Sequence, residues 1–431
     1  MAKKNNVKKP REMTRRALSH HEKAQRRQRW VFFGGIGVIL AVVLIILGGW
    51  FAGEYMPLHA TVMTVYDKSF SNQFFIDTLV VYGKIQGTEN LTSMASSILD
   101  QIKQNEIIRV EAEKLGIIVT DQEAIDYVAT TGFDVNDASI ELSRASIIIT
   151  KLQEEYFGSQ VSKTDMQYLV KAMLVEGASI AETCKQQLLA GGDFVELVEK
   201  YAVDTTSKGN SGDYGWHPMD VFETSLASTL AYEYLSGPDM KVGEINISVS
   251  DDTAYKQVGY WLIRVNERPD ETSVDVTALL VGNEELAKEI RTKLLNGEDP
   301  TVLAEKYTQF SATTSVPGEL GVITSSESIS AIFDEYAFNQ DTPLDEWSEV
   351  IKDEEVYTKG GVWVIWVEDE EADKELSTED YDNYVSTLYN EWLTGINSAA
   401  TEYVKSEITE KLLNFAISKA TDEIVAALST Q

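Results

Sequence analysis

Cysteine and histidine are both scarce in this chain of 431 residues. The single cysteine, Cys184, can form neither an intramolecular disulfide nor a cysteine-based metal site. Only four histidines are present, and the sequence contains no Cys/His metal spacing, no phosphate-binding glycine loop and no nucleophile elbow. We therefore expect no metal and no small-molecule cofactor, and we expect ordinary hydrophobic cores to stabilise the fold.

Basic residues become rare after the first thirty positions. Residues 1–30 contain eleven Lys/Arg and two acids, a net charge of +9, whereas the rest of the chain contains 26 Lys/Arg and 67 Asp/Glu, a net charge of −41. A surface this acidic repels phosphates, so a nucleic acid is not an expected partner. Pairs of acids such as Asp251-Asp252 are expected to lie on a solvated face.

Charge of either sign is missing over residues 30–53, a run of 24 residues. About twenty apolar residues cross a bilayer, and Trp30 and Trp50 stand at the two ends, where interfacial indoles usually lie. The run is longer than the apolar region of a signal peptide, about 7–15 residues, and no convincing Ala-x-Ala site follows. We predict a single-pass anchor in the cell membrane, with the basic arm 1–29 in the cytoplasm and the acidic bulk extracytoplasmic.

Helical patterns occupy both ends of the acidic part. Apolar residues recur at helical spacing in four segments: 91–115, 119–129, 137–156 and 378–428. Thr120 or Asp121 is the expected N-cap of the second segment. The last segment is long enough for one or two helices. These helical ends bracket a middle of different character.

The middle of the chain contains an internal repeat. Four matched pairs share one offset of 106 residues: Ala172-Met173-Leu174-Val175 with Ala278-Leu279-Leu280-Val281, Leu188-Leu189-x-Gly191-x-Asp193 with Leu294-Leu295-x-Gly297-x-Asp299, Glu199-Lys200-Tyr201 with Glu305-Lys306-Tyr307, and Gly212-Asp213-Tyr214-Gly215 with Gly318-Glu319-Leu320-Gly321. Each copy ends in a strand-like run, GYWLIRV at 259–265 and GVWVIWV at 361–367. The order of strand, helix, glycine turn and closing strand predicts two copies of an α+β domain.

The motifs of the first copy resemble the parvulin (PpiC-type) prolyl isomerases. They are Leu188-Leu189-Ala190-Gly191-Gly192-Asp193-Phe194, Leu197, Tyr201, Asp204, Gly212-Asp213-Tyr214-Gly215-Trp216, Val242-Gly243-Glu244-Ile245 and Gly259-Tyr260-Trp261-Leu262-Ile263. The whole arrangement is similar to the SurA and PrsA foldases. The resemblance implies an α+β chain with an N-terminal transmembrane helix, a helical SurA-N-like chaperone module and two tandem parvulin-like domains. The implied ranges are 54–165 for the module, 166–270 and 271–370 for the domains, and 371–431 for C-terminal helices packing on the module.

Catalytic residues of the parvulins are mostly replaced in this chain. The family uses two histidines and a Cys or Asp, and the matching histidine positions hold Ala172 and Trp261 in the first copy and Ala278 and Trp363 in the second. Asp204 matches the Cys/Asp position, although it also suits a turn or a helix cap.

The only histidine inside a repeat is His217, which follows the Gly-Trp turn. A lone histidine on a loop is usually solvated, so Asp204 and His217 are weak catalytic candidates.

An apolar socket for a proline ring is implied by the same resemblance. The candidates for peptide binding are Met219, Phe222, Trp216 and Trp261. For Trp261 two interpretations stay open, a stacking face for a peptide and an ordinary core position, because aromatic residues at alternating strand positions are common in cores.

Three functions remain under consideration. The first is a membrane-tethered chaperone that holds unfolded, newly exported polypeptides, with parvulin domains that have lost catalysis. The second is an active peptidyl-prolyl cis-trans isomerase that uses the first parvulin domain. The third is an envelope scaffold that binds one fixed partner.

Overall fold

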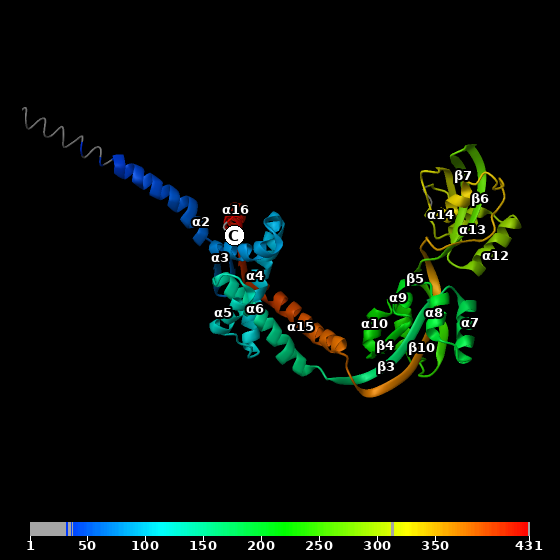
Figure 1. Cartoon of the computed structure of the whole chain (residues 1–431), viewed down its shortest axis with the longest axis horizontal. Coiled ribbons are helices and arrows are strands. Elements are labelled where there is room, and N and C mark those ends of the chain that lie inside the picture. Colours follow the sequence, from blue (N-terminus) through cyan, green and yellow to red (C-terminus); the bar gives the residue numbers. More distant parts are fainter. Residues whose placement is uncertain (1–31, 33–35, 37, 312–313, 430–431) are drawn as a thin grey trace, which may run out of the picture. The chain divides into compact units, whose positions relative to one another are not determined.

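The computed structural model describes residues 32, 36, 38–311 and 314–429. The predicted basic arm 1–29 and the beginning of the predicted anchor 30–53 lie outside the described residues. The chain divides into two compact units, the first made of Met1–Val161 with Val385–Gln431 and the second of Ser162–Tyr384 (Figure 1).

An apolar helix precedes the first globular elements. Residues Val38–His59 form one helix of 22 residues with a mean hydropathy of 2.1 and no buried part, which makes it long and apolar enough to cross a membrane. It includes a π-helical turn, η1 (Phe51–Tyr55), and ends in α2 (Met56–His59). The expectation of an apolar helix in this region is therefore confirmed.

The first unit combines helices with a small sheet. Its helices are α3 (Asn72–Gln86), α4 (Leu91–Lys114), α5 (Asp121–Thr131), α6 (Asp137–Lys151) and α16 (Glu410–Leu428), with single turns η2 (Thr88–Asn90), η3 (Leu152–Phe157), η4 (Gly158–Gln160) and η6 (Thr401–Tyr403). Its strands β1 (Thr61–Val65), β2 (Lys68–Ser71) and β11 (Val404–Ser406) form a sheet in the order β11-β1-β2. The remaining helix, α15 (Thr378–Ala400), contains the division between the units.

The predicted helices are confirmed with bounds close to those expected. Thr120 is the N-cap of α5 and forms a capping box with Glu123, in which each side chain bonds the other residue's backbone N–H. The C-terminal pattern divides into two helices, α15 and α16.

Residues from distant parts of the sequence share the core of the first unit. Val62, Phe75 and Leu79 are buried in one cluster with Ala416 and Ile424 of α16. The strand β11 also pairs with β1, so C-terminal residues complete both the core and the sheet of the N-terminal segment.

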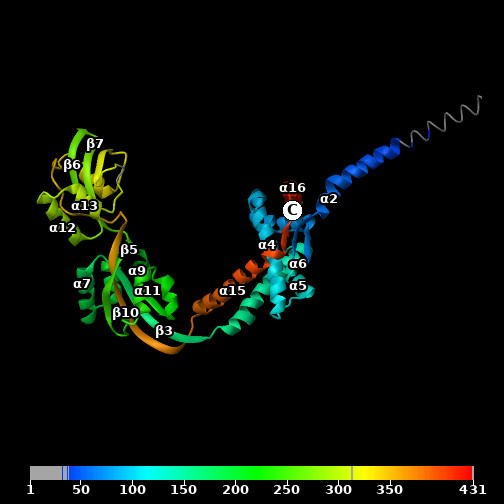
Figure 2. The ribbon, with the colours of Figure 1, turned by 180° about the vertical axis from the view of Figure 1, so that it is seen from behind.

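The second unit contains two lobes, each built on a four-stranded antiparallel sheet (Figure 2 shows them from behind). The first lobe comprises β3 (Thr164–Val175), α7 (Ala178–Leu189), α8 (Phe194–Tyr201), α9 (Thr205–Gly209), β4 (Asp213–His217), η5 (Met219–Val221), α10 (Phe222–Ser225), α11 (Thr229–Leu235), β5 (Ile245–Lys256) and β10 (Thr358–Glu375). Its strand order is β4-β3-β10-β5.

The second lobe repeats this arrangement. It comprises β6 (Gly259–Asp270), β7 (Ser273–Val281), α12 (Glu284–Leu295), α13 (Pro300–Tyr307), β8 (Glu319–Thr324), α14 (Ala331–Ala337) and β9 (Ile351–Asp353), with strand order β8-β7-β6-β9. The repeated glycine turn is present in both lobes, where Gly191 and Gly297 adopt φ values of 89° and 87°.

The closing strand of each sequence repeat lies in the sheet of the other lobe. The expectation that each repeat closes its own sheet is therefore wrong. The run 259–265 lies in β6 and pairs with β7 of the second lobe, whereas 361–367 lies in β10 and pairs with β3 and β5 of the first. Lys256 and Thr358 are direct partners across β5 and β10, so the second lobe is inserted between two neighbouring strands of the first. Both runs share one apolar pattern, so their sequences do not distinguish the two sheets.

Candidate functional site

The positions expected to hold catalytic imidazoles lie in hydrophobic cores. Ala172 and Ala278 are 0% and 2% exposed, and each lies in a buried cluster with a tryptophan of its lobe's closing strand. Because of the strand exchange, Ala172 shares its core with Trp363, and Ala278 shares its core with Trp261. No proton-transferring side chain stands at either pair of positions.

Each of these tryptophans bonds to a buried aspartate. Trp261 Nε1 donates to Asp353 Oδ2 at 2.9 Å, and Trp363 Nε1 donates to Asp251 Oδ2 at 3.3 Å. The same aspartates accept from the N-cap serines of α14 and α11, Ser330 at 2.5 Å and Ser228 at 2.6 Å.

This Trp–Asp–Ser arrangement ties the closing strand to a helix N-terminus in both lobes. Asp251 is 1% exposed, so the expectation that Asp251-Asp252 lies on a solvated face is wrong for its first member. A buried carboxylate needs several donors, and the tryptophan and serine supply them.

Trp261 belongs to the core and offers no stacking face to a peptide. Its side chain is 0% exposed, and its ring lies edge-on to Phe310 and Phe333 at centroid distances of 5.2 Å and 4.9 Å. Of its two interpretations, the core position is the one the geometry supports.

The other expected peptide-binding residues are only partly accessible. Phe222 is 0% exposed and packs in the core of the first lobe, so it does not line an open socket. Met219 and Trp216 are half-buried, and the Lys374 ammonium lies 4.3 Å from the centroid of the Trp216 ring. The four residues therefore do not form one exposed apolar surface.

Asp204 acts as a helix cap. Its Oδ2 accepts from Ser207 N at 2.7 Å at the start of α9, and its Oδ1 accepts from Leu174 N at 3.3 Å. The side chain is 8% exposed, and both carboxylate oxygens are used within the fold. This is the helix-cap role that its sequence position also suggested.

His217 is not the solvated loop histidine that the sequence favoured. Its Nδ1 lies 2.8 Å and 2.9 Å from the two carboxylate oxygens of Asp380, which is 1% exposed at the start of α15. Ser377 Oγ donates to the same carboxylate at 2.9 Å. Sequence reasoning missed Asp380, whose only signal was an acid in the first turn of a predicted helix.

Asp204 lies beside the C-terminal end of β3, whereas His217 lies beside its middle. Asp204 bonds to Leu174, whereas His217 pairs with Tyr168 across β3 and β4, six residues earlier. At about 3.3 Å per residue, this separation is roughly 20 Å. The two weak catalytic candidates therefore do not share one site.

An apolar groove opens on the first unit. Its volume is about 320 Å³, and we call it the apolar groove. Its lining includes apolar and aromatic side chains and two amides: Val81, Tyr82, Ile85, Tyr127, Phe133, Leu142, Ile149, Gln101 and Asn105. Ile85 is 62% exposed and Tyr127 42% exposed. These side chains come from α3, α4, α5 and α6, except Phe133, which lies in the loop between α5 and α6.

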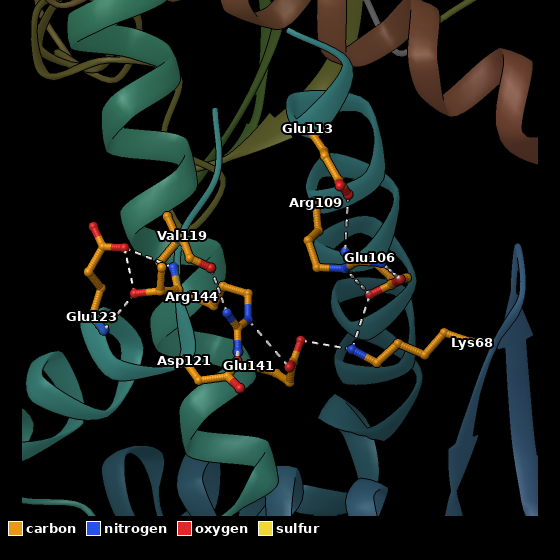
Figure 3. Close-up of polar contacts among 10 residues, drawn as sticks. Lys68, Glu106, Arg109, Glu113, Val119, Asp121, Glu123, Glu141 and Arg144 are labelled. Atoms are coloured by element: carbon orange, nitrogen blue, oxygen red, sulfur yellow. Dashed lines mark hydrogen bonds and ion pairs between the residues drawn. The ribbon is translucent and has the colours of Figure 1, made fainter. Parts of the chain in front are cut away.

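A network of ion pairs fixes the helices that carry the groove (Figure 3). The carboxylate of Glu106 in α4 is 2% exposed and pairs with Lys68 of β2 at 3.2 Å and with Arg109 at 2.6 Å. The hydrogen bond to Glu106 raises the pKa of Arg109. Lys68 also pairs with Glu141 of α6 at 2.9 Å, so one lysine joins a strand to two helices.

Arg144 makes the second half of this network. It donates from Nη1 to the Val119 carbonyl at 2.7 Å and from Nη2 to Asp121 at 2.6 Å, which joins α6 to the start of α5 (Figure 3). The adjoining cavity of about 230 Å³ is lined by these already paired charges, so we assign the network a structural role.

Known proteins similar to this chain are foldases and chaperones. No protein-family model matches the chain. The foldase protein PrsA of Caldanaerobacter subterraneus is 28% identical over 241 residues, which are 52% of this chain and 70% of that protein. The chaperone SurA of Saccharophagus degradans is 29% identical over 136 residues, 30% of this chain and 29% of SurA. PrsA of Geobacillus kaustophilus is 26% identical over 37% of this chain and 48% of its own length.

The solved structures found include PrsA proteins from two bacilli. The structure of PrsA from Bacillus cereus covers 84% of this chain and 99% of its own length at 12% identity and a TM-score of 0.26. The structure from Bacillus subtilis has a TM-score of 0.20 at 11% identity, with 79% and 85% covered. The sequence matches confirm that the chain is similar to the SurA and PrsA foldases.

Proposed function

We propose that this chain is a membrane-anchored foldase that holds unfolded polypeptides after their export. The apolar groove of the first unit is the observation that carries the proposal, because it offers exposed Ile85 and Tyr127 beside the amides of Gln101 and Asn105. The similarity to PrsA and SurA supports a chaperone or foldase function.

The chemistry of the groove suits weak binding of many sequences. Apolar contacts provide affinity without direction. Gln101 Nε2 donates to Asn105 Oδ1 at 2.8 Å, so it is Gln101 Oε1 and the Asn105 side-chain N–H groups that can pair with the backbone of an extended client. Ordering an unfolded client has an entropic cost, which keeps such complexes short-lived. Anchoring close to the site of export raises the effective concentration of the groove for emerging clients.

The proposed topology follows from charge and hydropathy. The helix Val38–His59 supports a transmembrane anchor, and the basic residues before it favour a cytoplasmic N-terminus under the positive-inside rule. The part of the first unit that follows this helix and the whole second unit are then extracytoplasmic. We further propose that the two lobes are parvulin-like domains and that the first unit corresponds to the SurA-N-like module with its C-terminal helices.

Both lobes are proposed to have lost isomerase catalysis. Rotation about an X-Pro bond has a barrier of about 18–20 kcal/mol, and lowering it requires polar groups that favour the twisted amide. The alanine and tryptophan positions are buried core, Asp204 caps a helix, and His217 lies roughly 20 Å from it along β3. In a protease-coupled proline-peptide assay, we expect the full chain to give the uncatalysed rate, and a rate above it would refute this part of the proposal.

Aggregation of an unfolded reporter tests the holding function. The full chain in lipid nanodiscs is expected to suppress aggregation at near-stoichiometric ratios. Ile85→Asp removes an exposed apolar contact of the groove, so we expect client affinity to fall by about 1–2 kcal/mol.

Leu189→Asp provides the matched control for that variant. Leu189 is 70% exposed on α7, outside the groove, so its replacement is expected to leave suppression unchanged. Absence of suppression by the unmodified chain, or equal losses in the two variants, contradicts the proposal. A pull-down that yields one dominant partner instead of many clients favours a fixed scaffold.

A further inference from the structure

The apolar helix continues directly into the first unit without a flexible linker. The helix Val38–His59 is followed by Ala60 alone before β1 begins at Thr61. The Ala60 carbonyl accepts from Asn72 N at 2.8 Å at the start of α3, and Leu58 packs against the core of the unit. The direction in which the helix leaves the unit is therefore fixed by the fold.

The C-terminal helix contacts this apolar helix at its first charged residue. Glu54 follows the uncharged run and pairs with Lys419 of α16 at 2.7 Å. The same ammonium lies 5.6 Å from the centroid of the Phe415 ring, one helical turn earlier on α16. Trp50 and Tyr55, both exposed on the apolar helix, flank Glu54 as interfacial aromatic residues do.

We propose that α16 lies in the headgroup layer of the membrane that the helix spans, with Lys419 on the lipid-facing side and the Phe415 ring, half-buried against the core of the unit, beside it. This inference rests on the proposed anchor. The first charge after a membrane-spanning run marks the edge of the hydrocarbon core, and the headgroup layer beyond it is about 5–8 Å thick on each side. Lys419 is held 2.7 Å from that charge, so its ammonium falls within this layer and within reach of lipid phosphates.

The basic and aromatic groups of this face suit the layer, whereas the exposed Asp422 carboxylate on the same side does not. A lysine places its ammonium among phosphates while its stem covers apolar surface, and an aromatic ring prefers the interface to bulk water. A fixed docking of α16 gives the first unit one orientation toward the membrane, in addition to a tether.

Spin-label accessibility tests the inference on the full chain in vesicles of phosphatidylcholine and phosphatidylglycerol. Cys184 is buried and has a raised pKa, so an introduced cysteine is the reactive one. A426C places a label on α16 two turns beyond Lys419, on the same helical side, and leaves the charge of the helix unchanged. S159C in η4 is the control, because η4 follows the end of α6 that lies away from α2 in both views (Figures 1 and 2).

We expect a water-soluble nickel relaxant to reach the A426C label several-fold less than the S159C label. Equal accessibility in a chain that resists alkaline extraction from the vesicles overturns the docking and leaves the anchor intact. Extraction of the chain by alkali shows that the anchor itself is wrong. Circular dichroism of each labelled chain confirms that the substitutions leave the helices formed.

Discussion

A designed disulfide across β5 and β10 tests the strand exchange directly. Tyr255 and Lys359 are direct partners in the register of these strands, and both are exposed, with the lysine ammonium 4.8 Å from the tyrosine ring centroid. Opposed residues of antiparallel strands have Cα atoms about 4.5–5.5 Å apart, which falls within the range that a disulfide accepts. We therefore expect Y255C/K359C to form an intramolecular disulfide under mild oxidation.

The magnitude of the effect follows from the size of the closed loop. Positions 255 and 359 enclose the whole second lobe, a loop of roughly 100 residues, for which chain entropy gives about 4.7 kcal/mol of stabilisation at 25 °C. The oxidised protein should unfold at higher denaturant concentration than the same protein after reduction. Strain in the new bond reduces the gain, so about 4.7 kcal/mol is the upper value.

Peptide mapping under non-reducing conditions provides the assay, and denaturant unfolding followed by circular dichroism provides the energy. The single variants Y255C and K359C are the controls, since each can form only intermolecular bonds with exposed thiols. If the double variant forms only dimers and no intramolecular disulfide, β10 does not pair with β5 and the second lobe is not inserted there.

Three further predictions concern buried polar groups in the second unit. Replacing Asp353 by alanine leaves Trp261 Nε1 and Ser330 Oγ without their acceptor, so D353A should lower the free energy of unfolding by about 1–3 kcal/mol in a urea titration. D353N keeps an acceptor, so its free energy of unfolding, measured in the same urea titration, should fall by less. Burial lowers the pKa of Lys256 to about 8, so the unfolded chain binds more protons than the folded chain between pH 8 and about 10.4. The free energy of unfolding should therefore rise with pH over that window, and K256M should lack this rise. Equal pH slopes of the free energy of unfolding in the two proteins contradict the assignment. Despite the opposing effect of burial, hydrogen bonds from Ser228 and Thr253 lower the pKa of Asp251. The contribution of Asp251 to the free energy of unfolding should therefore be present above about pH 3.9 and disappear as the pH falls through the folded-state pKa. Acid unfolding of D251N should begin from a less stable protein and show a weaker pH dependence.

Local patterns in the sequence were sufficient for much of the helical structure. The capping residues Thr120 and Glu123 mark the start of α5, and the offset of 106 residues correctly pairs α7 with α12, α8 with α13 and the glycine turns of the two lobes. The helix α3 and the three short strands of the first unit were not anticipated. Strand β11 is only three residues long, and its pairing with β1 joins positions more than 330 residues apart, which no local pattern reveals.

The partners of the site residues were harder to foresee for the same reason. His217 and Asp380 are 163 residues apart in the sequence, and Asp251 and Trp363 are 112 apart. An acidic pair in an acidic chain gives no sign that one member is buried. The assignment of the two closing strands failed because GYWLIRV and GVWVIWV suit either sheet, and only the long-range topology separates them.

The inserted lobe imposes an order of events on biosynthesis. Strand β10 lies between β3 and β5 in the middle of the first sheet, yet it emerges after the entire second lobe has been made. The part of the second unit that is translated first is consequently the last to finish folding, and it waits with unpaired strand edges while about 100 further residues appear. Such edges invite association with other chains, so this protein is itself exposed to misassembly while it is being made.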